Sequence, residues 1–302
     1  MKYTKFKINN FHFLVLPGQS GTYLCATCLM AFVGIALDTI LMEARLPPDK
    51  LEKCLTLIKA MLSQKKTTLL QLQSLIGLLN FTTCVVVAGR AFLRRLIDLT
   101  IGLSKPHHHR WLTKEAKADL RVWCDFLTDF NGRSFFFKDV VLSSTSLNLY
   151  TDACTTDGFG LVLGSHWTFG AWEDKFKSYN IAVLEFYPIL LAVHLWAPLL
   201  ANSVVVFHTD NIALVSVINN QTCRDPQLMH VLRQLVLVCL RHNILFRCEH
   251  IKGILNSQAD ILSRLNSKFQ MEDFWNASSH LKMDPDPVEI PEDLHHRFLL
   301  PP

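Results

Sequence analysis

The sequence lacks the features expected of a membrane-spanning or secreted protein. Its two longest apolar stretches, residues 25–42 and 186–207, are interrupted by polar residues or prolines, so neither offers about 20 clean apolar residues. The nine cysteines show no framework spacing, which favours a reducing compartment, the cytosol or the nucleus. Cys25 and Cys28 are close together, but no second ligand pair accompanies them, so two thiols are a better interpretation than a zinc site.

Charged residues are scarce and unevenly distributed. They make up 19% of the chain against 50% hydrophobic residues, a balance that excludes global disorder and allows a packed core. Residues 266–302 contain three Lys/Arg and seven Asp/Glu, and the whole chain carries a net charge of +4, so residues 1–265 carry +8. A basic body followed by an acidic end is compatible with a polyanionic partner.

The pattern of apolar residues changes near residue 143. Residues 45–130 predict an all-helical module, with helices after Pro47, after Thr68, over residues 89–102 and after Thr113. The spacing of Thr68 and Gln71 predicts a capping box at the start of the second helix. Residues 1–30 show no clear pattern.

Residues 143–266 predict an α/β domain. Strands are expected at 146–151, 159–164, 166–172, 203–209 and 244–253. Helices are expected between about 181 and 201, after residue 210, over 226–241 and from residue 256. The acidic, proline-containing residues 267–302 are expected to form an extended tail.

Four acidic residues stand out within this domain. Asp152 and Asp210 each close an apolar strand, and such strand ends meet at one edge of an open α/β sheet when the strands are neighbours. Glu185 is the only charged residue on an apolar segment, where a buried carboxylate needs a partner. The alternatives are a buried ion pair or an exposed position at the rim. Asp260 lies one turn into the helix that starts near Asn256.

Carboxylates packed together repel one another unless cations lie between them. Oxygen ligands of this kind suit Mg²⁺ or Mn²⁺, and two such ions about 4 Å apart can promote the attack of water on a phosphodiester. These acids therefore predict a metal-dependent phosphodiesterase site.

The motifs LYTDA, LEFYPI, HTDN and HIKGILNSQAD, in this order, resemble a ribonuclease H domain. The resemblance implies a mixed sheet flanked by helices, two Mg²⁺ ions as cofactors (or Mn²⁺) and an RNA–DNA hybrid as substrate. It maps the catalytic, metal-binding acids onto Asp152, Glu185, Asp210 and Asp260, and a catalytic-site histidine onto His250. The motifs FHTDN and ADILSR are most similar to those in the ribonuclease H of tyrosine-recombinase retrotransposons of the DIRS and Ngaro type.

The resemblance extends to the helical module. FVGIALDT, RLPPDKL, LLQLQSLIGLLNF and GRAFLRRL resemble the thumb and connection that follow the polymerase palm of a reverse transcriptase. No Asp-Asp pair of the kind found in the palm occurs in the chain. We therefore expect an unassigned segment at residues 1–30, a thumb/connection-like module at 31–142, a ribonuclease H-like domain at 143–266 and a tail at 267–302.

Three functions remain open on the sequence alone: a hybrid-cleaving enzyme, a non-catalytic nucleic-acid-binding relic, and a structural subunit of a longer polymerase chain. Two further expectations concern polar residues outside the four acids. We expect a phosphate contact or a solvated face at Arg90, Arg94 and Arg95. We expect Asn256 to cap a helix and to have a second role in contacting nucleic acid. Residues 107–109 are three histidines that fit a linker better than a metal site, and Asp157 fits a turn.

Overall fold

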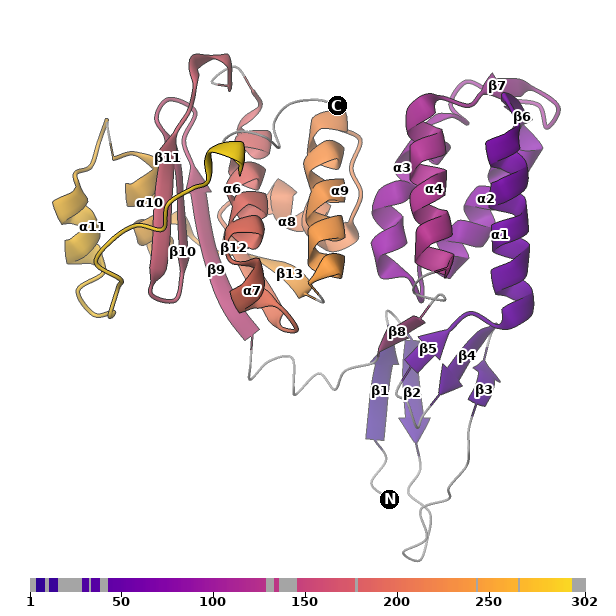
Figure 1. Ribbon diagram of the computed structural model, residues 1–302, viewed down its shortest axis with the longest axis horizontal. Helices are drawn as coiled ribbons and strands as arrows, with labels where there is room; N and C mark the ends of the chain where they lie inside the picture. The colour runs from indigo at the N-terminus through magenta and orange to yellow at the C-terminus, as the bar shows by residue number, and fades with distance from the viewer. Residues whose placement is uncertain are drawn as a thin grey trace, which may run out of the picture. The chain divides into compact units, whose positions relative to one another are not determined.

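The computed structural model describes residues 4–8, 11–15, 29–32, 34–38, 43–128, 133–135, 146–176, 179–242, 244–265 and 267–294 (Figure 1). Cys25 and Cys28 lie outside the described residues. The chain forms two compact units, Met1–Val141 and Leu142–Pro302, which are described separately. In the described part of the chain, no helix has the length and apolar character needed to cross a membrane.

The first unit combines helices with short strands. Its helices are α1 (Pro48–Ser63), α2 (Leu69–Thr82), the 3₁₀ helix η1 (Val87–Phe92), α3 (Arg94–Asp98) and α4 (Lys114–Thr128). Strands β1 (Thr4–Ile8) and β2 (Phe11–Val15) form an antiparallel pair. A second sheet has the order β3-β4-β5-β8, from Leu29–Phe32, Ile35–Asp38, Glu43–Arg45 and Arg133–Phe135. The strands β6 (Lys66–Thr68) and β7 (His109–Trp111) pair as a two-stranded ribbon.

Local capping explains where two of these helices begin. The Thr68 hydroxyl accepts from the Gln71 N–H at 3.2 Å, and the Gln71 side chain accepts from the Thr68 N–H at 2.9 Å, so the predicted capping box is confirmed. Thr113 accepts from the Ala116 N–H at the start of α4. The single helix expected over residues 89–102 is instead the 3₁₀ turn η1 followed by the short α3, and strands accompany the expected helices.

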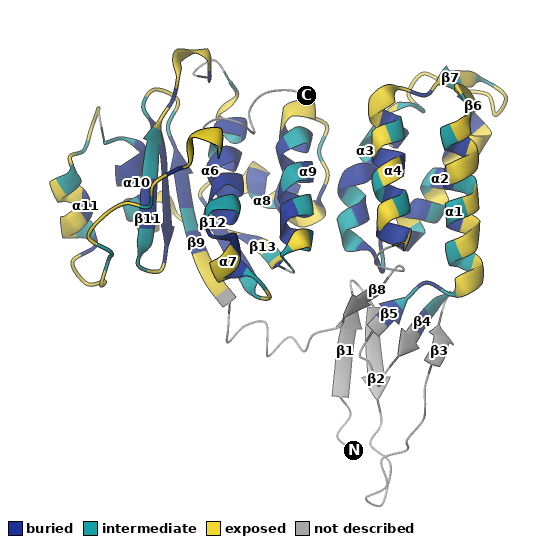
Figure 2. Ribbon diagram, viewed as in Figure 1, coloured by how far each residue is buried: buried dark blue, intermediate teal, exposed yellow. Residues whose placement is uncertain are grey.

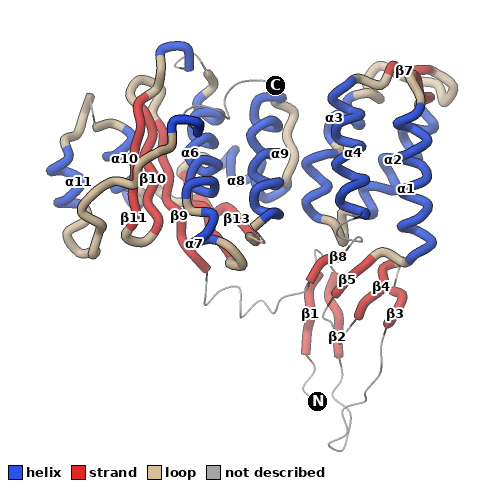
Figure 3. Tube along the Cα trace, viewed as in Figure 1, coloured by secondary structure: helices blue, strands red, loops and turns tan. Residues whose placement is uncertain are grey.

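The second unit is built on a five-stranded mixed sheet with the order β11-β10-β9-β12-β13. The strands are β9 (Ser146–Ala153), β10 (Gly158–Leu163), β11 (His166–Ala171), β12 (Val204–Thr209) and β13 (Leu245–His250). Neighbours among β9, β10 and β11 are antiparallel, whereas β12 is parallel to both β9 and β13. This arrangement, with its flanking helices and a preceding helical region, confirms the expected ribonuclease H-like fold (Figure 3).

Helices lie on both sides of this sheet. Figure 1 shows α6 (Ile181–Leu195), α8 (Ile212–Asn220) and α9 (Pro226–Arg241) on one side. The helices α10 (Ser257–Ser263) and α11 (Met271–Ala277) lie on the other. The short α7 (Ala197–Leu200) and the 3₁₀ turns η2 (Asp174–Phe176), η3 (Gly253–Leu255) and η4 (Glu292–Leu294) complete the unit. The helix α6 is almost wholly buried, as its apolar sequence predicts (Figure 2).

The expectation of an extended tail is wrong for the described residues after 270. Phe274 on α11 is fully buried against Trp167 in an apolar cluster. The chain then follows the edge strand β11, where the Trp167 indole donates to the Asp284 carbonyl at 2.8 Å and the Val288 N–H donates to the Trp167 carbonyl at 2.8 Å. The acidic and proline-rich composition of the segment concealed this packing, although Phe269, Met271, Phe274 and Trp275 lie close together in the sequence.

Candidate active site

The four predicted acids are carried by four different elements of the second unit. Asp152 lies inside β9, and Asp210 directly follows the neighbouring parallel strand β12. Glu185 is on α6, and Asp260 is in the first turn of α10. Because β9 and β12 run in the same direction, their carboxyl ends bring Asp152 and Asp210 to the same edge of the sheet.

Gly160 allows α10 to approach this edge. It pairs with Asp152 across β9 and β10, and a Cβ at this position would lie 2.4 Å from the Leu262 Cβ and 2.6 Å from the Ala259 carbonyl oxygen. Only a residue without a side chain permits such close packing of helix and strand. The glycine therefore fixes where α10 carries Asp260 and Ser263 relative to Asp152.

Asp152 is buried, and its surroundings disfavour the charged form of its carboxyl group. Its exposed fraction is 7%, and the Ser263 hydroxyl donates to its Oδ2 at 2.6 Å. Burial is the main cause that raises the pKa of Asp152 to about 7; the charges of Asp210 and Asp260 add to it, while the Ser263 bond and Arg264 oppose it. These charges show that three of the predicted acids are neighbours.

Glu185 belongs to the same neighbourhood. Burial, followed by the charges of Asp210 and Asp152, raises the pKa of Glu185 to about 7, against a hydrogen bond from Asn211 that lowers it. The side-chain oxygen Oδ1 of Asn211 already accepts hydrogen bonds from the Ala213 and Leu214 N–H groups at the start of α8. The side-chain NH₂ of Asn211 is therefore the donor left for Glu185. The Glu185 Oε2 is buried and has no hydrogen-bond partner among the described residues.

Asp210, Asp260 and His250 complete the group on its more open side. Asp210 is exposed, and a Cβ on Gly253 would lie 3.4 Å from its Oδ2, so the backbone of η3 approaches this carboxylate. Asp260 forms an ion pair with Arg264 at 2.9 Å. His250 ends β13 opposite Thr209 and is exposed to solvent, adjacent in register to the strand end that Asp210 follows.

The donor set suits a hard divalent cation. All four side chains offer carboxylate oxygens, one oxygen is buried without a partner, and two carboxyl groups have raised pKa values because of burial and of negative charges nearby. Within the described ranges, however, no group of three or more His, Cys, Asp or Glu residues is placed closely enough to hold a metal ion. The acids are thus neighbours rather than a preformed metal cage.

Two of the three arginines predicted to contact phosphate form ion pairs with acidic residues. Arg94 pairs with Asp98 at 2.6 Å, and Arg95 pairs with the buried Asp119 at 3.0 Å. Arg90 lies half-buried in η1. Phosphate contact remains a prediction for all three, and the ion pairs give Arg94 and Arg95 a role in holding α3.

Asn256 occupies the predicted cap position with a different side-chain role. It precedes α10, but its side chain makes no cap hydrogen bond and instead donates to the Thr151 carbonyl at 2.9 Å. The residue is 2% exposed, which leaves little surface for the predicted contact with nucleic acid. Asp157 lies in the turn between β9 and β10, where its carbonyl accepts from the Trp172 N–H.

Four residues of this site had no sequence prediction: Gly160, Asn211, Gly253 and Ser263. Asn211 carries a usable signal, since an asparagine directly before an apolar helical run is a common N-cap. Ser263 and the two glycines carry none, because their importance comes from contacts with residues distant in the sequence.

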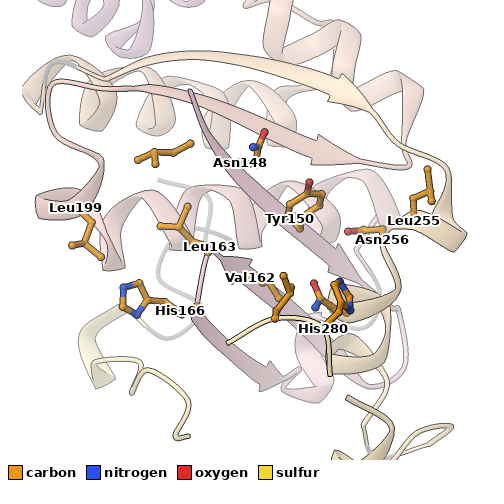
Figure 4. Close-up of a pocket in the computed structure, with 14 residues that line it drawn as sticks. Asn148, Tyr150, Val162, Leu163, His166, Leu199, Leu255, Asn256 and His280 are labelled. Carbon is orange, nitrogen blue, oxygen red and sulfur yellow. The ribbon is translucent and has the colours of Figure 1, made fainter. Parts of the chain in front are cut away.

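A cavity of about 740 Å³ opens beside the site (Figure 4). Tyr150, Leu163, His166, Leu199 and Asn256 are among its lining residues, whereas none of the four acids is. It is therefore separate from the carboxylates, and Asn256 is the lining residue whose side chain bonds to the backbone next to Asp152.

No protein-family model matches the chain, and no curated protein matches it. Solved structures show similarity to parts of it. The N-terminal RNase H domain of a Mycobacterium tuberculosis protein is 15% identical over 45% of this chain and 98% of that chain, with a TM-score of 0.34. RNase H1 from the halophilic archaeon Halobacterium salinarum is 11% identical over 39% of this chain and 92% of that chain, with a TM-score of 0.31.

A foamy viral protease–reverse transcriptase in complex with an RNA/DNA hybrid spans more of this chain. It is 13% identical over 73% of this chain and 29% of that chain, with a TM-score of 0.29. Scores this low carry no argument about activity. The ribonuclease H-like assignment depends on the strand order and strand directions of this chain.

Proposed function

We propose that this chain is the ribonuclease H part of a reverse transcriptase and hydrolyses the RNA strand of RNA–DNA hybrids. The observation that supports the proposal is that Asp152 feels the charges of Asp210 and Asp260, and Glu185 feels those of Asp210 and Asp152, from four separate elements. A fold gains no stability from carboxylates of this kind, because burial, together with their mutual repulsion, disfavours the charged form and raises the pKa values of Asp152 and Glu185. Such an arrangement is typical of a functional site.

Asp152, Glu185, Asp210 and Asp260 would hold two Mg²⁺ ions, or Mn²⁺ as the alternative. The ions would supply Lewis acidity and a water of lowered pKa. Ser263 keeps Asp152 oriented and favours its charged form, and Asn211 does the same for Glu185. Both residues thus prepare the carboxylates to act as anionic ligands near neutral pH.

His250 is proposed to assist proton transfer or the release of product. It is exposed at the end of β13, next to the strand end that Asp210 follows, so it can exchange protons with solvent. The first unit is proposed to grip the hybrid, and a longer polymerase chain is the proposed protein partner.

The proposed source is a DIRS- or Ngaro-type retrotransposon, on the strength of the phrases FHTDN at 207–211 and ADILSR at 259–264. The proposed compartment is the cytosol or the nucleus, because the cysteines have no framework spacing.

A second candidate is a non-catalytic nucleic-acid-binding module, or a structural subunit of a longer polymerase. It is favoured by the absence, within the described ranges, of a group of acids close enough to hold a metal ion. Asp260 also has a structural partner, Arg264, so part of the acidic charge is compensated within the protein.

The substitution Asp210→Asn separates the two candidates. On a labelled RNA–DNA hybrid in Mg²⁺ or Mn²⁺, we expect the parent to cut and the variant to lose cleavage by orders of magnitude, with hybrid affinity little changed at fixed salt. Asp286→Asn, an exposed acid outside the site, is the matched control and should cut like the parent. A parent that binds the hybrid but never cuts it would establish the non-catalytic candidate instead.

A further inference from the structure

One section of the first unit has an extreme charge balance. Residues 64–114 contain eight Lys/Arg and one acidic residue, Asp98. That single acid is paired with Arg94 at 2.6 Å. This section therefore has almost no internal negative charge to compensate its lysines and arginines.

The β6–β7 ribbon gathers much of this charge in one place. Lys66 pairs with Trp111 in the strand register, the Leu112 N–H donates to the Lys65 carbonyl at 3.0 Å, and the Leu69 N–H donates to the His108 carbonyl at 2.9 Å. Residues 65–70 and 105–112 therefore lie side by side. We call the group Lys65, Lys66 and Trp111, at one end of this ribbon, the ribbon tip.

Trp111 is unusual among the tryptophans of the chain. Its exposed fraction of 59% is the largest among the six tryptophans, against 37% for Trp275 and less than 5% for each of the other four. The Lys66 Nζ lies 4.4 Å from the ring centroid, so the ring and a cation form one combined surface.

The cations of the ribbon tip are available to an anion. Among the described residues, no acidic side chain forms an ion pair with Lys65 or Lys66. The neighbouring Arg110 donates to the Leu99 carbonyl at 3.1 Å and to the Ile101 carbonyl at 2.5 Å, which fixes β7 against the chain that follows α3. These hydrogen bonds hold the ribbon tip in place against the rest of the first unit.

We propose that the ribbon tip binds single-stranded nucleic acid, with Lys65 and Lys66 on the phosphates and Trp111 stacked on an unpaired base. Uncompensated lysines provide the charge complementarity, and an exposed indole provides a stacking platform that the paired bases of a duplex cannot use. The site belongs to the first unit and requires neither cleavage nor the four acids. Its test is therefore independent of the proposed ribonuclease activity.

The test measures binding of a fluorescein-labelled oligo(dT) 12-mer to the full chain by anisotropy, over a series of salt concentrations. We expect Lys65→Ala/Lys66→Ala to weaken binding at low salt by about tenfold and to reduce the slope of log K against log salt by about 0.7 for each phosphate that is no longer neutralised. The matched control is Lys53→Ala/Lys59→Ala, two exposed lysines of α1, which should stay within about twofold of the parent.

Trp111→Ala should weaken binding by about tenfold without changing the salt slope, and Trp111→Phe should retain most of the affinity. Thermal unfolding of each variant shows whether the fold is kept, and the Phe variant keeps the test valid if the Ala variant unfolds. The proposal is overturned if the lysine variant binds like its control, or if loss of the ring has no effect. Equal losses on a blunt duplex, or equal binding of the parent to phosphatidylserine vesicles, also overturn it.

Discussion

Ser263 and Asp152 are 111 positions apart in the sequence, yet the Ser263 hydroxyl donates a hydrogen bond of 2.6 Å to the Asp152 carboxylate. The bond stabilises the charged form of an acid whose burial favours the neutral form. Ser263→Ala should therefore raise the pKa of Asp152 further. We expect the acidic limb of the pH–rate profile for hybrid cleavage to move to higher pH, with little loss at about pH 9. Ser267→Ala, on an exposed serine, is the control, and identical profiles for all three proteins would contradict this role.

The pKa values of Asp152 and Glu185 predict how the stability of the metal-free protein depends on pH. Both rise to about 7 from ordinary values of 3.8 and 4.5, so the folded state holds protons that the unfolded state releases. Their contribution is fully present below about pH 4 and is lost as the pH rises through about 7. Urea unfolding in EDTA should show a lower free energy of unfolding at about pH 8 than at about pH 5.

The variant Asp152→Asn isolates this effect. At about pH 8 without metal it should be more stable than the parent by roughly 2–4 kcal/mol, because a buried charge is removed, and the difference should shrink towards about pH 5. Asp286→Asn should follow the parent at both values. If the free energy of unfolding changed between about pH 5 and about pH 8 by the same amount in the parent and in Asp152→Asn, the Asp152 charge would not destabilise the fold.

Gly160 and Gly77 provide a matched pair of glycine substitutions. Gly160→Ala places a methyl group 2.4 Å from the Leu262 Cβ, so we expect a loss of roughly 1–3 kcal/mol in unfolding free energy and loss of cleavage as α10 shifts. Gly77 lies on α2, and a Cβ there meets nothing within 4 Å, so Gly77→Ala should stabilise by about 0.5–1 kcal/mol. Chemical denaturation measures both, and a harmless Gly160→Ala would refute the close packing.

The residues after 267 should be needed for stability. The extended tail expected from the sequence implies that deletion of residues 268–302 leaves cleavage within a few-fold of the parent, but this deletion removes Phe274 from its cluster with Trp167. Phe274→Ala should lower the free energy of unfolding by about 3–5 kcal/mol, whereas Leu281→Ala, at a position 44% exposed, should lower it far less. Full stability after the deletion would show that the packing on β11 contributes nothing.

Local signals predicted most of the fold. The Thr68 capping box, the strand that ends before Asp210 and the helix over 226–241 all follow from neighbouring residues, and the structure contains each of them. The four acids were found because each sits in a motif with a recognisable place in the chain. Contacts between distant segments were not predicted: the hydrogen bond of Ser263, the close packing at Gly160 and the docking of Phe274 leave no trace in local periodicity.

The segment that follows α11 has a consequence for how the protein behaves at high concentration. The strand β11 is the last of its sheet, and an edge strand offers unpaired backbone groups to any other extended chain. Here the Asp284 N–H donates to the Ser165 carbonyl, the Val288 N–H donates to the Trp167 carbonyl, and the Thr168 hydroxyl donates to the Val288 carbonyl. The protein's own chain therefore covers the beginning of β11, and this part of the edge is less available for pairing with an extended segment of a second copy.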